Sequence, residues 1–217
     1  CNFGSSHGLY GYNYEDIEDK YKCFNFGLVS QTLSYDYRLF QYYGDHIEEG
    51  SVVFITISYF SLFGKDEVNE DDFESKNKRY YTILPPSLIK EYNFKTDLLV
   101  RRLPSLGVDT IVLIKTLLGD STGRNFEEWQ QTAMDIDVDK DAQAAYVRHI
   151  EKNKYNEGGH RIVNQEEIDA LYALIEACKE KGAIPVLITT PYLSEYVEEI
   201  KENAPHFYDD FYAIVNR

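Results

Sequence analysis

The chain has 217 residues, of which 43% are hydrophobic, 15% aromatic and 27% charged, a composition typical of a folded globular protein and not of a disordered segment. This length suits one sizeable α/β domain, so we expect residues 1–217 to form a single domain. The formal net charge of −15 repels phosphate backbones, which argues against nucleic acid as a partner.

The sequence contains no membrane-spanning or metal-binding pattern. No run of about eighteen apolar residues is present and no signal-peptide pattern opens the chain, so we expect no membrane insertion by this segment. The three cysteines, Cys1, Cys23 and Cys178, are widely spaced without a CxxC pair, which indicates buried or incidental thiols and no zinc site. Oligomeric state and compartment are not indicated by these features.

The first predicted elements are a strand, a helix and a second strand. A short apolar run at 22–26, closed by Gly27, predicts a strand. Helical spacing of apolar residues predicts a helix over 30–43, ended by Gly44. The β-branched run at 52–58 is typical of a parallel strand buried on both faces.

The middle of the chain is polar. The charged stretch 64–82 predicts a surface excursion, and two short helices are expected between 86 and 118. Residues 121–164 have little pattern apart from a helix near 142–152, which is compatible with an insertion or lid.

The last third returns to alternating elements. Asn164 as N-cap with Glu167 at the third helical position predicts a helix start, and the helix ends at Gly182. Residues 183–188 predict a strand, followed by one helix from about Leu193 and another from about Pro205. An alternating α/β fold requires a further strand after these helices, so we expect the segment to be truncated there.

A serine-rich turn at 2–8 precedes the first predicted strand. In 2–8, Gly4, Ser5, Ser6 and His7 stand where a strand would deliver its carboxyl end into a loop, the place where ligands bind in open α/β sheets. A serine at such a strand-to-helix turn exposes its hydroxyl while nearby backbone N–H groups point at the same space. The ends of the next two predicted strands would meet the same cleft.

This order of blocks resembles the SGNH (GDSL-like) hydrolase superfamily, with Gly4-Ser5-Ser6 as its first block and Gly27 as its second. More narrowly, four runs resemble its branch of cell-envelope and exopolysaccharide O-acylation proteins (alginate O-acetylation-like and teichoic acid D-alanyl transfer-like): FGSSHGLYG, FNFGLVSQTLSYDYRLFQYY, ITISYFSLFG and YALIEACKEKGAIPVLITTPYL. The resemblance implies a three-layer α/β/α sandwich with a parallel, five-stranded, flavodoxin-like sheet.

The resemblance also implies an activity, that of a serine esterase or O-acyltransferase acting on acetyl-like esters of a carbohydrate or cell-envelope polymer. Ser6 is then the nucleophile, and the N–H groups of Ser6 and Gly27 are oxyanion donors. Ser58 is a weaker third donor, and His7 and Tyr59 line the substrate site. The partner is a small acyl ester or glycan, with no cofactor and no metal, and an extracytoplasmic location is favoured.

Two departures from the family pattern stand in the sequence. The third block lacks its Asn, since the stretch reads Ile57-Ser58-Tyr59-Phe60-Ser61, so a hydroxyl of Ser58, Tyr59 or Ser61 would replace it. The Asp-x-x-His that supplies the base is absent before Arg217. We therefore expect a segment cut at both ends, with the catalytic His beyond it.

Other interpretations stay open. A non-catalytic glycan-binding module with the same fold explains the missing Asn and His, and a glycoside hydrolase with paired carboxylates ranks below it because no pair stands at a strand end.

Three other local features fit a functional site less well than the serine-rich turn at 2–8. Gly119-Asp120-Ser121 matches the family motif by letters but follows no suitable strand, and His206 opens a helix without an Asp-x-x-His. The alternating acids from Asp135 to Asp141 resemble a calcium loop, but Lys140 replaces its Gly and Tyr146 its Glu, which indicates a solvated, helix-capping run.

Overall fold

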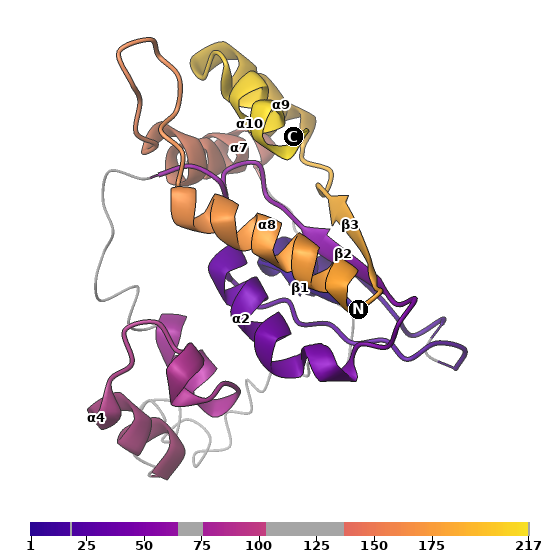
Figure 1. The fold of residues 1–217 in the computed structure, drawn as a ribbon. Helices are drawn as coiled ribbons and strands as arrows, with labels where there is room; N and C mark the ends of the chain where they lie inside the picture. The colour runs from indigo at the N-terminus through magenta and orange to yellow at the C-terminus, as the bar shows by residue number, and fades with distance from the viewer. Residues whose placement is uncertain (18, 65–75, 103–136, 217) are drawn as a thin grey trace, which may run out of the picture. The chain divides into compact units, whose positions relative to one another are not determined.

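The computed structural model describes residues 1–17, 19–64, 76–102 and 137–216. The chain divides into two compact units, the first formed by Cys1–Glu67 with Thr132–Arg217 and the second by Val68–Gln131. The first is an α/β unit built on a parallel sheet (Figure 1).

The sheet has three strands in the order β1-β2-β3, all parallel: β1 (Asn2–Gly4), β2 (Val52–Thr56) and β3 (Ile184–Ile188). Gly4 lies opposite Thr56, and Thr56 lies opposite Ile188. The carboxyl ends of the strands therefore share one edge of the sheet. The strands predicted at 52–58 and 183–188 are confirmed.

The strand predicted at 22–26 is wrong as a full strand, because only Asn25 forms a parallel bridge, to Asn2 of β1. Asn2 N–H donates to the Phe24 carbonyl and Phe26 N–H to the Asn2 carbonyl, at 3.1 and 2.9 Å. Because β1 is only three residues long, few backbone hydrogen bonds can form on that side of it. The chain thus passes to one side of β1 and then crosses to β2 on the other, so the direction of winding switches between β1 and β2.

β3 is an edge strand among the described residues, and its sequence suits that place. Ile184 N–H donates to the Ser51 carbonyl and Ile57 N–H to the Ile188 carbonyl, so the main chain of Pro185 and Leu187 faces away from β2. Proline has no N–H to leave unpaired at such a position.

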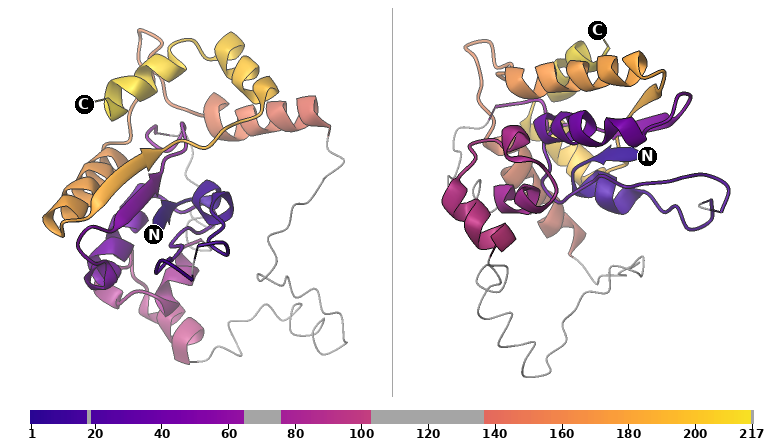
Figure 2. Two further views of the ribbon diagram at one scale, coloured as in Figure 1. Left: turned by 90° about the vertical axis from the view of Figure 1, so that its right-hand side faces the viewer. Right: turned by 60° about the horizontal axis from the view of Figure 1, so that its bottom comes forward.

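Helices cover both faces of the sheet. α2 (Leu33–Tyr43) and α8 (Gln165–Glu180) lie side by side on one face, and α1 (Ser6–Gly11) lies on the other (Figure 2). The helix predicted over 30–43 is confirmed but begins at Leu33, because Ser30 has a positive φ of 57° and Thr32 is the extended N-cap. Apolar side chains of the strands, of α2 and of α8 are almost fully buried: Phe3, Leu39, Val53, Ile55, Leu171 and Leu174.

The other helices of this unit also follow the predicted pattern. α7 (Val138–Tyr146) runs into a π-helical turn (Val147–Glu151), and the chain leaves β3 to form α9 (Ser194–Asn203) and α10 (Phe207–Val215). Asp137 caps α7 by accepting a hydrogen bond from Lys140 N–H at 3.2 Å, as predicted for the acidic run. Asp135, Gly119, Asp120 and Ser121 lie outside the described residues.

The described part of the second unit is built from short turns of helix: Lys78–Thr82, Pro86–Leu88, α4 (Phe94–Asp97) and Leu98–Arg102. The surface excursion predicted for 64–82 is wrong in this part, because Tyr80 and Tyr81 are 1% exposed. The Tyr81 ring stacks on Tyr92 and its hydroxyl accepts from Asn93 N–H at 2.7 Å. Among all described helices, none combines the length and apolarity that crossing a membrane requires.

Candidate functional site

Residues 4–7, termed the serine turn below, join β1 to α1 at the carboxyl edge of the sheet. Gly4 has a φ of 134°, and a Cβ atom there would lie 2.8 Å from both the Cβ and the carbonyl oxygen of Thr56. Only glycine fits this conformation and this approach to β2. The turn from strand to helix is therefore sharp, as in turns that expose a nucleophilic serine.

Three side chains of the serine turn and of the segment after β2 meet at this edge. Ser58 Oγ lies 2.9 Å from His7 Nδ1, and Ser5 Oγ lies 3.4 Å from both atoms. Ser5 and His7 follow β1 and Ser58 follows β2, so the group stands where the winding of the sheet switches direction, the usual ligand position in such folds. The sequence singled out Ser58 and His7, but not Ser5.

His7 is a neutral imidazole in this setting. Burial lowers the pKa of His7 below its ordinary value, so the ring is uncharged at neutral pH. If Ser58 donates its hydroxyl proton to Nδ1, the ring proton resides on Nε2. Among the described residues no carboxylate bonds to His7, so the third member of a Ser-His-Asp arrangement is not present in them.

Tyr192, from the loop after β3, covers this group. Its ring centroid lies 5.3 Å from that of His7. Its buried hydroxyl lies near the hydroxyls of Ser58 and Thr190 and near Tyr59 N–H, without the geometry of a well-formed hydrogen bond. Burial raises the pKa of Tyr192, so the phenol is a neutral polar group that a ligand can engage.

Tyr59 lies next to this group but packs toward α10. Its ring centroid is 5.2 Å from that of Tyr192 and also of Tyr208, and 4.8 Å from that of Phe211. The side chain is half-buried. Tyr59 is therefore as much part of an aromatic cluster as it is part of the site.

Ser6, the expected nucleophile, is the first residue of α1 and is half-buried. No group of the described residues bonds its hydroxyl, whereas the neighbouring Ser5 hydroxyl lies near His7 and Ser58. The structure thus groups Ser5, and not Ser6, with the imidazole.

Gly27, the expected second oxyanion donor, has its N–H occupied. That N–H donates to Asn25 Oδ1 at 2.8 Å. A Cβ atom at Gly27 would lie 2.6 Å from Leu9 N, so glycine is required here for close packing against α1. The Asn25 carboxamide also donates to the carbonyl oxygens of Gly8 and Leu9, at 3.2 and 3.0 Å. Asn25 thereby holds the C-terminal end of α1.

A buried carboxyl lies behind the serine turn. Asp36 of α2 is 1% exposed, and its Oδ1 accepts from Gly4 N–H at 3.1 Å and from Gln31 Nε2 at 2.6 Å. Burial raises the pKa of Asp36 to about 8. A sequence signal existed, because Asp36 stands three residues after Leu33 and four before Phe40, on the apolar face of the helix.

The described residues contain no group of three or more His, Cys, Asp or Glu side chains that could hold a metal ion. His206, the alternative histidine, lies just before α10 with its ring 4.7 Å from that of His160. Compared with known proteins, the chain matches no family model, no curated protein and no solved structure.

Proposed function

We propose that the protein is a serine esterase or O-acyltransferase of the SGNH kind, acting on acetyl-like esters of a carbohydrate or cell-envelope polymer. The observation that carries this proposal is the serine turn, a glycine-dependent strand-to-helix turn at the carboxyl edge of a parallel sheet. The position and the residue type match what acyl transfer through a serine requires. We also propose that the sheet is of the five-stranded, flavodoxin-like kind found in that superfamily; the described residues contain three parallel strands.

The reaction would proceed through an acyl-enzyme. The Ser6 hydroxyl loses its proton to a general base and attacks the ester carbonyl, and the resulting oxyanion is held by backbone N–H groups of the turn. The carbonyl re-forms as the alcohol leaves with a proton. Water or a sugar hydroxyl then takes the acyl group from Ser6.

The residues around Ser6 divide the remaining tasks. His7 already engages Ser58, so it lines the site, and the general base would be the Asp-x-x-His histidine that the resemblance implies. The Ser58 hydroxyl can rotate from His7 toward the oxyanion, in place of the missing Asn. Gly27 would contribute its N–H only after releasing Asn25.

The test is labelling of the full-length protein with a fluorophosphonate probe, which reacts with activated serines. We expect Ser6→Ala to abolish labelling, while the matched variants Ser5→Ala and Ser58→Ala keep it at a reduced rate. Labelling that depends on Ser5 and survives in Ser6→Ala would move the nucleophile to the serine paired with His7. A wild-type protein that takes no label would refute the esterase.

A glycan-binding module is the second candidate, favoured by the occupied Gly27 N–H and by the lack of a carboxylate at His7 among the described residues. The Tyr59 and Tyr192 rings would then contact sugar. This candidate predicts saturable binding on a glycan array, lost in Tyr192→Ala, together with an unlabelled wild-type protein. Binding with full labelling would instead report substrate recognition.

A further inference from the structure

We propose that Asp36 is a positioning residue for the serine turn, and that it acts as the hydrogen-bond acceptor for Gly4 N–H and Gln31. This inference rests on the proposed function, because it concerns how the nucleophile is held. Asp36 contacts neither substrate nor reacting atoms, and it acts only through the backbone of Gly4.

One rung is missing from the ladder of backbone hydrogen bonds beside β1. Asn2 N–H donates to the Phe24 carbonyl, Phe26 N–H to the Asn2 carbonyl and Leu28 N–H to the Gly4 carbonyl. A regular parallel ladder would add a bond from Gly4 N–H to the Phe26 carbonyl. Gly4 N–H instead donates to Asp36 Oδ1.

Gln31 and Asp36 together replace that rung. Gln31 Nε2 donates to the Phe26 carbonyl at 2.8 Å and to Asp36 Oδ1 at 2.6 Å, and it lies 3.4 Å from the Gly4 carbonyl oxygen. Both side chains are buried, at 6% and 1% exposure. The N–H of Gly4, two residues before Ser6, is therefore bonded to a side chain, Asp36, instead of to a backbone carbonyl.

The surroundings of Asp36 favour the neutral carboxyl. Burial is the largest cause of its raised pKa, and Glu167 of α8 adds a like charge, while the Gln31 and Gly4 donors act in the opposite direction. Glu167 has its own partners, because it accepts from the N–H and the hydroxyl of Ser34. An uncharged acceptor of the same shape should therefore replace Asp36.

Two substitutions of Asp36 should therefore differ in their effect. Asp36→Asn keeps an acceptor oxygen for Gly4 N–H and Gln31, whereas Asp36→Leu has a similar size and no acceptor. Displacement of a catalytic group by about 1 Å can cost about 100-fold in rate. We expect the fluorophosphonate labelling rate of Ser6 in Asp36→Asn to stay within about threefold of wild type, and in Asp36→Leu to fall between about 10-fold and 100-fold.

Glu167→Gln is the matched control, since it neutralises the other buried acid without touching the serine turn, and it should label at the wild-type rate. Equal labelling of folded Asp36→Asn and Asp36→Leu would overturn the inference. If Asp36→Leu does not fold, Gln31→Met removes the same rung from the other side and should show the same loss.

A second measurement separates this inference from the proposed function. Amide hydrogen exchange of Gly4 should be slow in wild type and Asp36→Asn, and at least about 10-fold faster in Asp36→Leu or Gln31→Met, because its N–H has lost its acceptor. A wild-type protein without label but with this exchange pattern refutes the enzyme and keeps the positioning role. Unchanged Gly4 exchange in both rung-removing variants refutes the positioning role, whatever the labelling shows.

Discussion

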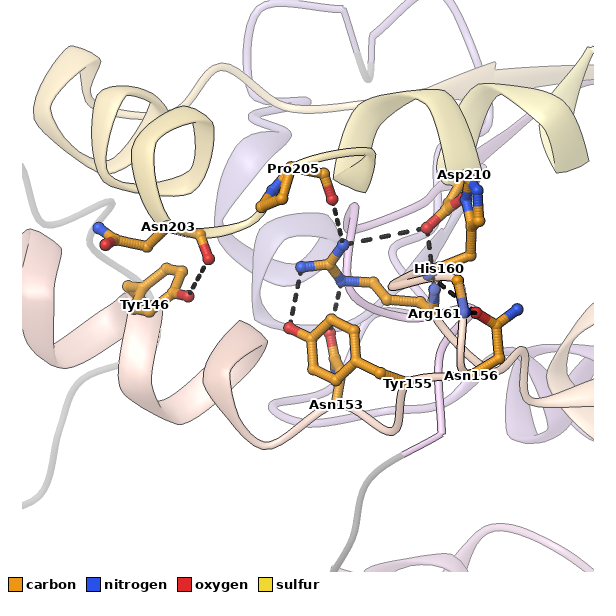
Figure 3. A network of polar contacts seen from close by, with 10 residues as sticks. Tyr146, Asn153, Tyr155, Asn156, His160, Arg161, Asn203, Pro205 and Asp210 are labelled. Carbon is orange, nitrogen blue, oxygen red and sulfur yellow. Dashed lines mark hydrogen bonds and ion pairs between the residues drawn. The ribbon is translucent and has the colours of Figure 1, made fainter.

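Two buried polar networks in the described part of the first unit differ in charge: one surrounds a carboxyl with uncharged donors, and the other pairs a guanidinium with a carboxylate. Behind the serine turn, the donors that the Asp36 carboxyl has among the described residues are uncharged, Gly4 N–H and Gln31. Around Arg161, a fully buried guanidinium is surrounded by oxygen acceptors and aromatic rings (Figure 3). Its nitrogens donate to Tyr155 Oη, Asn153 Oδ1 and the Pro205 carbonyl at 3.1, 3.3 and 3.5 Å.

The difference between the networks follows from the groups themselves. Burial lowers the pKa of Arg161, but a guanidinium stays charged in proteins, so it requires a counter-ion. Asp210 of α10 supplies it, with Oδ2 lying 3.9 Å from Nη1 of the guanidinium. The same Oδ2 also accepts a hydrogen bond from the backbone N–H of Arg161 at 3.0 Å. In the described part of the chain no cation lies beside Asp36, so its carboxyl can keep its proton. Burial is thus offset by a counter-ion at Arg161, whereas it favours the protonated carboxyl at Asp36.

The largest expected effect comes from removing the counter-ion of Arg161. Asp210→Ala leaves a buried guanidinium without a carboxylate, which should lower the free energy of unfolding by about 3–5 kcal/mol. Urea denaturation measures it. Asp209→Ala is the matched control, because it removes an acid from the same first turn of α10 at an exposed position. Similar losses in both variants would show that helix-end charge, and not the ion pair, stabilises α10.

Glycines in the two regions provide the next test. Gly4→Ala should cost about 2–4 kcal/mol, because its φ of 134° is strained for alanine and its Cβ meets Thr56. Gly159, in the turn between Tyr155 and Arg161, has a φ of 76° and open space around a Cβ atom. Gly159→Ala should cost only about 1 kcal/mol. Thermal unfolding of both variants checks this, and equal costs would mean that Thr56 does not limit the serine turn.

The pH dependence of stability tests whether Asp36 is neutral. Folded Asp36 keeps its proton up to about pH 8, whereas the unfolded carboxyl releases it near 3.8, so unfolding releases a proton between these values and rising pH favours unfolding. Wild type should lose about 1.4 kcal/mol per pH unit relative to Asp36→Asn between pH 5 and 7. Urea unfolding at several pH values measures the difference. A constant difference would show that Asp36 is ionised in the folded protein.

Most of the helices and strands could be predicted because their apolar residues recur with a regular period. The run at 52–58 and the amphipathic stretch of α8 carry that period over whole elements. The run at 22–26 also looks like a strand, but the Asn25 carboxamide bonds to the end of α1 and to Gly27 N–H. Such a long-range contact has no signal in local pattern.

The site was predictable only in its position. The turn after β1 could be found because glycine and serine before a helix are typical of sites at strand ends. The Ser5–His7–Ser58 group could not, since it depends on how the segment after β2 approaches the turn. Asp36 had a signal in its place on the apolar face of α2, but its partners Gly4 and Gln31 are set by the broken ladder.

The smallest expected effect concerns His160, which lies on the exposed side of the Arg161 network. His160 Nδ1 lies 2.7 Å from Asp210 Oδ1, but its side chain is 51% exposed, so solvent screens the pair. His160→Ala should therefore cost less than about 1 kcal/mol in urea unfolding, because Asp210 keeps its contacts to buried Arg161. A loss as large as that of Asp210→Ala would mean that Asp210 depends on His160 for its position, and that burial of Arg161 alone does not hold α10 in place.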